Sequence, residues 1–393
     1  MSDLFNPTAE HQALRRLVRE FAEREVDPQA TRHDREERFN LPLFRRLGDL
    51  GLLGITVAAE DGGAAMDATA AVIVCEELGS ADPGFTLAYL AHAILFANNL
   101  AHNADPEQRR RILPAVCRGE KVGGMCLSEP AVGTDVLGMQ TTARREGDQY
   151  LLHGTKMWIT NGALDDDDLG DVFLVYARMR GAGRRELSQF LVEKGSPGFT
   201  LGQKLHDKLG MRASTTAELV FEDCRVPADN LIGAEGQAML HMMRNLEIER
   251  LTLAGISLGI ARRCIEVMMR YTTERHAFGQ PLHAFGQIQR YIADSYAEFM
   301  AGRCYTYQIA RGLDLTARGN RVDSDGVKLY TATMAKDVAD RAIQVLGGYG
   351  YVGEYQVERL WRDAKLMEIG GGTIEAHQKN MSADLVAGDG TIP

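Results

Sequence analysis

The chain lacks long apolar runs, concentrated positive charge and numerous cysteines, and each absence excludes a class of protein. Its net charge is -10 and its 44 Lys and Arg residues are dispersed, whereas nucleic-acid binding needs a clustered basic face. The first residues, MSDLFNPTAEHQ, show no signal-peptide pattern, and no apolar run approaches the roughly 20 residues that span a bilayer. We therefore expect no nucleic-acid partner, no membrane partner and no export.

The cysteines lie far apart and never form a C-x-x-C pair. The histidines likewise lack H-E-x-x-H or another ligand spacing. We interpret the cysteines as small core residues in a reducing compartment, and we predict neither a metal site nor a disulfide. The cysteines are Cys75, Cys117, Cys126, Cys224, Cys264 and Cys304.

The residue pattern divides the chain into three parts and predicts an α+β fold. Hydrophobic residues make up 45% of the 393 residues, as in folded domains, and the length suggests two or three packed units. Residues 1–121 show helical periodicity, as in ALRRLVREF. Residues 122–232 have a strand pattern, and residues 233–393 return to helical periodicity. We expect the two helical units to pack together as one body with the β unit inserted between them.

The β unit is expected to be antiparallel. Its short β-branched segments alternate polar and apolar residues, and no helix-length period lies between them, which argues against β-α-β crossovers. The acidic run Asp165–Asp168 falls between two strands, and we interpret it as a solvated loop. The strand segments are VGGMCL, QYLLHGTKMWIT, DVFLVYARM, LSQFLVEK and TTAELVFEDCRV.

Two short motifs match known fingerprints but lack the necessary context. Gly348–Gly353 has the G-x-G-x-x-G spacing of dinucleotide-binding folds, yet a helical pattern precedes it where a strand is required. Gly255–Gly259 matches the nucleophile elbow G-x-S-x-G, yet it lies inside a continuous helical pattern. We expect no Rossmann site, we interpret the second motif as close helix packing, and a hydrolase is only a weak rival hypothesis.

Five ordered motifs span nearly the whole chain. They are MCLSEPAVGTDV (125–136), KMWITNG (156–162), DKLGMRASTTAELVFEDCRVP (207–227), ERHAFGQPL (274–282) and QVLGGYGYVGEYQVERLWRDAKLMEIGGGT (344–373). In order and spacing they resemble the acyl-CoA dehydrogenase family. The resemblance implies an N-terminal helical domain (1–121), a middle antiparallel β domain (122–232) and a C-terminal four-helix bundle domain (233–393). It also implies a homotetramer with FAD between subunits.

The resemblance assigns FAD contacts to residues of each motif. Trp158 and Thr160 can give the flavin ring aromatic cover and a hydrogen bond. Arg275 and Phe278 are expected to reach the diphosphate and adenosine of a neighbouring subunit's FAD. Gln287 departs from the pattern, because many members have a glutamine directly after Phe285. The full set is Met125, Leu127, Ser128, Thr134, Trp158, Ile159, Thr160, Arg275, Phe278, Gln287, Gln344, Gly348, Thr373 and Glu375.

The reaction implied by the resemblance requires a carboxylate base. An α-proton leaves the acyl-CoA thioester while a hydride leaves the β-carbon. Medium- and short-chain members have the glutamate at the position that matches Gly371. Isovaleryl-CoA and long-chain members have it in a segment similar to NLEIERLTLAG (245–255). The resemblance therefore assigns the base to Glu249.

Helical geometry separates Glu249 from Glu247, because the two are about 200° apart on a helical wheel. Glu247 has Arg244 and Arg250 three residues away on either side, which is the spacing of surface ion pairs. Glu249 has apolar residues at i−7, i−3, i+4 and i+7 and no cation at i±3 or i±4. Burial of such a carboxylate should raise its pKa, as a base for a carbon acid requires.

The remaining site assignments concern the acyl-CoA. The resemblance places Thr134 near the thioester and the main chain of Gly371 and Gly372 at the thioester oxygen, where an N–H would stabilise enolate-like charge. Arg250 is interpreted either as a ligand contact or as a partner of Glu247. The segments KLMEIGGGT and NLEIERLTLAG resemble the isovaleryl-CoA branch of the family, which implies a short branched-chain acyl-CoA such as isovaleryl-CoA as substrate, and the glycines would leave room for the branch.

The electron acceptor, the rival activities and the location follow from analogy. The expected acceptor is an electron-transfer flavoprotein. The alternatives are another acyl-CoA, an acyl chain on a carrier protein, an oxidase that passes electrons to oxygen, or a non-catalytic flavin-binding protein. The expected location is the cytoplasm, or the mitochondrial matrix for a processed organelle protein.

Overall fold

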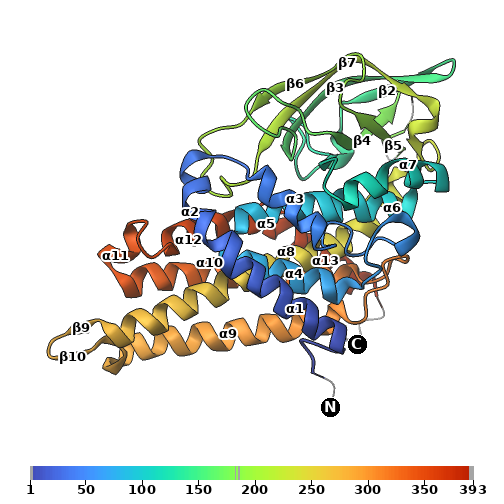
Figure 1. The fold of residues 1–393 in the computed structure, drawn as a ribbon. Coiled ribbons are helices and arrows are strands. Elements are labelled where there is room, and N and C mark those ends of the chain that lie inside the picture. The colour runs from blue at the N-terminus through green and yellow to red at the C-terminus, as the bar shows by residue number, and fades with distance from the viewer. Residues whose placement is uncertain (1–2, 182, 185, 389–393) are drawn as a thin grey trace.

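The β part of the protein rests on helices that come from both ends of the chain (Figure 1). The computed structural model describes residues 3–181, 183–184 and 186–388. The predicted order of helices, strands and helices is confirmed, with a helical body at one end of the molecule and a sheet at the other.

Most N-terminal α-helices, but not α2 and α6, begin after a residue whose side chain caps them. Asp105 accepts hydrogen bonds from the amides of Glu107 and Gln108, and Gln108 reaches back to the Asp105 amide, so a capping box precedes Pro106. The segments are α1 (Ala9–Phe21), a π-helical turn (Ala22–Val26), α2 (Asp27–Glu36), α3 (Leu41–Asp49), a 3-10 turn (Ala59–Asp61), α4 (Ala68–Ala81), α5 (Pro83–Leu90), a second π-helical segment (Ala91–Asn98), α6 (Asn99–Asn103) and α7 (Pro106–Cys117).

One helical stretch contradicts an expectation from the sequence. Pro83–Asn103 spans 21 residues and is long and apolar enough, by length and composition, to cross a membrane. The expectation that no apolar run approaches that length was therefore wrong. In the structure 83% of its most apolar window is buried inside the protein, which is the environment of a core helix.

The middle part forms one sheet, which contains eight strands in the described part of the chain. Their order is β6-β7-β3-β2-β4-β5-β8, and β1 pairs with β4. Most ladders are antiparallel, as predicted, but β1 and β2 both run parallel to β4. The strands are β1 (Gly123–Cys126), β2 (Thr142–Glu146), β3 (Gln149–Thr160), β4 (Val172–Met179), β5 (Leu187–Glu193), β6 (Phe199–Lys204), β7 (Thr216–Pro227) and β8 (Leu231–Ile232).

The end of β3 has an irregularity that exposes an aromatic ring. The register with β7 shifts between Lys156 and Ile159, and Trp158 within this bulge has φ 60°. Such bulges re-aim side chains. The Trp158 side chain is accordingly 53% exposed, whereas the neighbouring Ile159 is buried in the sheet core.

The C-terminal helices share one hydrophobic core with the N-terminal ones, as predicted. The long helices α8, α9 and α10 pack on one another, and α12 and α13 pack on α10. A small hairpin, β9 (His276–Ala277) and β10 (Gln280–Pro281), joins α8 to α9 and projects from their shared end (Figure 1). The helices are α8 (Ala238–Glu274), α9 (Gly286–Ala310), α10 (Arg321–Leu346), α11 (Gly348–Tyr351), α12 (Val357–Met367) and α13 (Ile374–Ala387).

Neither fingerprint-like motif has the strand-to-helix context that its function would require. Gly348–Gly353 follows helix α10 and begins α11, so no strand delivers these glycines. Gly255 and Gly259 lie inside α8 against α4, and a Cβ atom on Gly259 would be 2.5 Å from the Glu76 carbonyl oxygen. The predicted close packing of a buried helix is confirmed.

One residue-level expectation was wrong. Cys304 is exposed on α9, whereas the other five cysteines are buried. The domain limits at residues 121 and 232 stay a prediction; β1 begins at Gly123 and β8 ends at Ile232.

Candidate active site

A buried carboxylate lies on the long helix α8. Glu249 on α8 is 6% exposed, and its Oε2 atom has no hydrogen-bond partner among the described residues. Burial raises the pKa of Glu249 to about 7, although the charges of Arg250 and Lys328 lower it. The pKa of this carboxyl therefore lies near neutral pH, in an environment with little water, as a general base for a carbon acid requires.

The helix builds this environment from its own apolar side. Met242, Leu253 and Ile256 are buried at i−7, i+4 and i+7 from Glu249, in agreement with the predicted apolar stripe. The second cation, Lys328, comes from α10, a different helix. Spacing along α8 alone could not reveal it.

The glycine turn, Gly370–Gly372, faces the same carboxylate. Gly371 and Gly372 have φ angles of 67° and 101°, which L side chains rarely adopt. A Cβ atom on Gly371 would collide with Leu253 Cδ1 and would lie 3.4 Å from Glu249 Oε1. A side chain at position 371 and the side chain of Glu249 therefore compete for the same space.

Glu247 and Arg250 have partners other than the predicted ones. Glu247 is only 4% exposed, and its carboxylate accepts hydrogen bonds from the Asn320 amide at 3.0 Å and the Gly319 amide at 3.3 Å. Arg250 Nη1 lies 2.9 Å from Asp325 Oδ1. The predicted surface ion pairs of Glu247, including the alternative with Arg250, were wrong because the start of α10 covers this side of α8.

A buried polar cluster missing from the sequence-based site surrounds the glycine turn. Lys328 Nζ donates to the Gly372 carbonyl oxygen at 2.7 Å, and His377 Nε2 lies 3.0 Å from the same oxygen. His377 Nδ1 lies 2.6 Å from Asp325 Oδ1. Burial lowers the pKa of Lys328 to about 8, while the charge of Glu249 opposes this shift. The spacing of these residues in the sequence does not reveal the cluster, because only the packing of α10 and α13 brings them together.

The candidate flavin contacts at the sheet lie around a buried ion pair. Lys156 Nζ lies 2.9 Å from Glu129 Oε1, and the same carboxylate accepts hydrogen bonds from the amides of Gln140 and Thr141. Burial alone would raise the pKa of Glu129, but Lys156 and these donors hold it below its usual value. The pair anchors the loop after β1 beside the bulge of β3. Sequence reasoning named neither residue.

The loop after β1 and the end of β3 together offer a partly open surface. Leu127, Ser128 and Thr160 are half-buried, and Thr134 and Trp158 are exposed. An exposed indole beside hydroxyl groups suits a flat ring that has hydrogen-bonding heteroatoms. Met125 packs partly buried below this surface, and the buried side chain of Ile159 leaves only its main chain available.

The other candidate FAD contacts lie elsewhere in the subunit. Phe278 is 97% exposed at the tip of the β9–β10 hairpin, and Arg275 is exposed at its base. This hairpin projects away from the sheet domain (Figure 1). Within one chain, the contacts at the sheet and the contacts on the hairpin therefore lie apart.

The remaining candidate contacts are on the C-terminal helices. Four of them are exposed: Gln287 at the start of α9, Gln344 near the end of α10, Gly348 in α11 and Glu375 in the first turn of α13. Thr373 is half-buried and caps α13 by accepting a hydrogen bond from the Ala376 amide.

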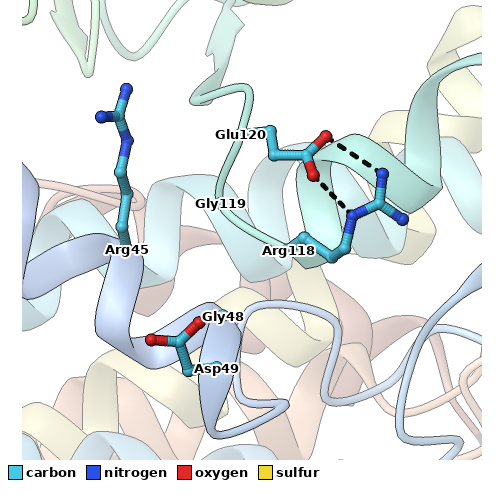
Figure 2. A pocket seen from close by; sticks show the side chains of 6 residues that line it. All are labelled: Arg45, Gly48, Asp49, Arg118, Gly119 and Glu120. Carbon is cyan, nitrogen blue, oxygen red and sulfur yellow. Dashed lines mark hydrogen bonds and ion pairs between the residues drawn. The ribbon is translucent and has the colours of Figure 1, made fainter.

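A surface hollow of about 730 Å³ lies apart from these residues, between the end of α3 and the end of α7. Figure 2 shows its lining, in which Arg118 and Glu120 pair and Arg45 points away from them. Gly48 packs against the Arg118 carbonyl so closely that a Cβ atom would not fit. The hollow contains none of the candidate catalytic or cofactor residues, and we interpret it as a helix junction. Within the described residues, no group of His, Cys, Asp and Glu could hold a metal ion.

Comparisons with known proteins agree with this architecture. Family models match residues 8–120, 124–224 and 238–386 as the N-terminal, middle and C-terminal domains of acyl-CoA dehydrogenase. The mitochondrial isovaleryl-CoA dehydrogenase of Pongo abelii is 41% identical over 387 residues, covering 96% of this chain and 89% of that protein.

Two solved structures are also similar over their full length. Butyryl-CoA dehydrogenase from Megasphaera elsdenii has a TM-score of 0.90 at 32% identity, with 96% of this chain and 98% of that chain covered. A chain in a structure described as an electron transferring flavoprotein of Acidaminococcus fermentans has a TM-score of 0.92 at 33% identity, with 98% and 100% covered.

The fold and these matches define a flavin-dependent oxidoreductase that acts on acyl thioesters. The chain belongs to the acyl-CoA dehydrogenase family. The resemblance found in the sequence motifs and the predicted fold class are thereby confirmed.

Proposed function

We propose that the protein catalyses α,β-dehydrogenation of a short branched-chain acyl-CoA, such as isovaleryl-CoA, with Glu249 as the base. The observation that carries the proposal is the position of the Glu249 carboxylate. It is buried, has an unpartnered oxygen, and lies 3.4 Å from where a Cβ atom of residue 371 would be. A glutamate on α8 and one on the glycine turn would thus reach the same place, which explains how the base can move between these positions.

In this mechanism Glu249 removes the α-proton of the thioester. A pKa of about 7 lets the carboxylate be ionised at neutral pH and still accept a proton from carbon. The amides of Gly371 and Gly372 donate to the thioester oxygen and stabilise the negative charge that develops there. Because Arg250 pairs with Asp325, we assign it an anchoring role within the substrate site.

The residues around the sheet bulge fit FAD. Trp158 would cover the ring, and Ser128, Thr134 and Thr160 would supply hydrogen bonds, with Met125, Leu127 and the Ile159 main chain beside them. When bound, FAD supplies the acceptor for the hydride that leaves the β-carbon. Arg275 and Phe278 would bind the cofactor of a second subunit, because their hairpin projects from their own. Gln287, Gln344, Gly348, Thr373 and Glu375 complete the proposed set.

The acyl chain is proposed to be short and branched. Without a side chain at Gly371, the space beside Glu249 is bounded by Leu253. Leu90 is buried on α5 in the same hydrophobic cluster as Leu253, and Leu87 and Leu95 pack partly buried against that cluster; we propose that these three leucines limit the chain length. Relatives named for isovaleryl-CoA and butyryl-CoA agree with a small acyl group.

The assembly, acceptor and location are proposed from the same similarities. A homotetramer would place the projecting hairpin of one subunit at the cofactor of another. An electron-transfer flavoprotein is the proposed acceptor, and similarity to the chain from Acidaminococcus fermentans supports a connection with such proteins. A location in the cytoplasm, or in the mitochondrial matrix for an organelle protein, stays a prediction; the Pongo abelii relative is named as mitochondrial.

A panel of acyl-CoAs with loss of the oxidised flavin spectrum as readout tests this function. We expect isovaleryl-CoA to reduce the flavin fastest, and Glu249→Gln to keep the yellow cofactor while slowing reduction at least about 100-fold. Glu247→Gln, a buried neighbour on another face of α8, is the matched control and should stay within about threefold of wild type. An active Glu249→Gln variant would contradict the assignment, and peroxide formed without an added acceptor would indicate an oxidase.

A further inference from the structure

The glycine turn has no side chains of its own to fix its conformation. Gly371 and Gly372 both lie in the left-handed region, and ordering a glycine costs more backbone entropy than ordering any other residue. Among the residues that the structure describes, neither the Gly371 nor the Gly372 amide has a hydrogen-bond partner. These free amides suit a ligand oxygen, but something else must hold the turn in place.

The Gly372 carbonyl is where the turn is held. Lys328 on α10 donates to this oxygen at 2.7 Å, and His377 on α13 approaches it with Nε2 at 3.0 Å. Both ring nitrogens of His377 face acceptors, the Gly372 carbonyl at Nε2 and the Asp325 carboxylate at Nδ1, so donation to both requires the doubly protonated ring. Burial lowers the pKa of His377, while the Asp325 carboxylate opposes this shift. As an imidazolium paired with Asp325, His377 joins Lys328 as a second donor from a second helix, and together they fix the peptide group immediately after the proposed thioester contact.

A second pair of residues orients the histidine. Asp325 Oδ1 lies 2.6 Å from His377 Nδ1 and 2.9 Å from Arg250 Nη1. Asp325 and His377 are fully buried, Lys328 is 1% exposed and Arg250 is 7% exposed. Charge-assisted contacts in such a dry interior are stronger than those at a surface, so the arrangement is stiff.

The same contacts tie the turn to the proposed base. Arg250 directly follows Glu249 on α8, and the Cβ position of Gly371 is 3.4 Å from Glu249 Oε1. A small movement of the turn would thus change the distance between its free amides and the carboxylate. Misplacement of about 1 Å at a reacting centre can reduce the rate about 100-fold.

Resting on the dehydrogenation proposed above, we propose that Lys328, His377, Asp325 and Arg250 form a clamp on the Gly372 carbonyl. We call this set the Gly372 clamp. Its members are positioning residues, which hold the amides of the glycine turn at the distance from Glu249 that the thioester oxygen and the α-carbon require.

Two histidine variants separate positioning from general packing. The side-chain nitrogen of His377→Gln can take the place of Nε2 and still donate to Gly372, whereas His377→Asn matches Nδ1 and loses that donor. Lys328→Met removes the other donor at similar length. Thr331→Val is the control, since Thr331 is buried on α10 and, within the described part of the chain, its hydroxyl bonds only the Val327 carbonyl of its own helix.

The first readout is hydrogen exchange of the resting protein without acyl-CoA, followed by mass spectrometry. The amides of Gly370 and Ile374 flank the clamp and donate to the carbonyls of Leu366 and Glu368. We expect their exchange to be about tenfold faster in His377→Asn and Lys328→Met, and within about threefold of wild type in His377→Gln and Thr331→Val.

The second readout is the split between kcat and KM for flavin reduction. In His377→Asn and Lys328→Met we expect kcat to fall about 10- to 100-fold with KM changed less than about threefold, while His377→Gln keeps most of its kcat. Equal losses in the two histidine variants, or unchanged exchange in both donor-deleting variants, would overturn the clamp. If no acyl-CoA reduces the wild-type flavin, the proposed dehydrogenation fails, and hydrogen exchange still decides whether the clamp exists.

Discussion

At the scale of single residues, the chemistry depends on one carboxyl group that the fold keeps out of water. Glu249 is on an apolar stripe that the sequence already shows, so its burial and raised pKa could be predicted from spacing along one helix. Lys328, Asp325 and His377 could not be predicted in this way. Their contacts with Arg250 and Gly372 join residues far apart in the chain, and packing of α8, α10 and α13 decides them.

The pKa of Glu249 predicts how the rate depends on pH. A base works only when ionised, so kcat/KM for flavin reduction should be constant above about pH 7 and fall about tenfold per pH unit well below it. Stopped-flow measurement of flavin reduction between pH 5.5 and 8.5 records this fall in kcat/KM. A flat profile across that range, with a substrate that does not ionise there, would assign the proton transfer to another group.

At the scale of helices and strands, the long elements follow from pattern and the short ones do not. The predicted segment QYLLHGTKMWIT is strand β3 residue for residue. Strands β2, β6 and β8 were missed, because β2 and β6 each have only one buried residue and β8 has only two residues. The parallel pairing of β1 with β4 was also missed, since local alternation does not say which strands become neighbours.

The contact of α4 with α8 predicts an unusual effect of alanine. A Gly→Ala change inside a helix normally stabilises it by about 1 kcal/mol. At Gly259 the added Cβ atom would be 2.5 Å from the Glu76 carbonyl oxygen and 2.6 Å from the Ser80 amide nitrogen. We therefore expect Gly259→Ala to lower the free energy of unfolding by about 1–3 kcal/mol, measured by denaturant titration.

Gly286→Ala is the matched control for this substitution. Gly286 is the first residue of α9, and a Cβ atom there would meet nothing within 4 Å. Its free energy of unfolding should stay within about 0.5 kcal/mol of wild type. Equal stability of the two variants would mean that α4 and α8 can separate without cost.

At the scale of the whole molecule, the exposed hairpin predicts that subunits depend on one another. Phe278 is 97% exposed even though its ring meets the Phe285 ring edge-on at 6.2 Å between centroids, and such exposure is unusual for a large aromatic side chain. If it binds the cofactor of a second subunit, Phe278→Ser should weaken FAD retention about tenfold. Flavin absorbance per subunit after gel filtration with light scattering measures both cofactor content and assembly.

Leu209→Ser provides the comparison for Phe278→Ser. Leu209 is also an exposed apolar residue, 53% accessible, but it lies between β6 and β7 and is not a candidate cofactor contact. Its flavin content and mass in solution should match those of wild type. Normal FAD retention and assembly in Phe278→Ser would remove the hairpin from the proposed site.

The buried stretch Pro83–Asn103 also has a consequence for synthesis of the chain. Its apolar surface is covered in part by α8, which begins at Ala238. The N-terminal helices therefore leave the ribosome well before α8 has been synthesised. Nascent chains that expose such apolar surfaces aggregate readily. Productive folding must wait for translation of the C-terminal half, so truncated products should need chaperones to stay in solution.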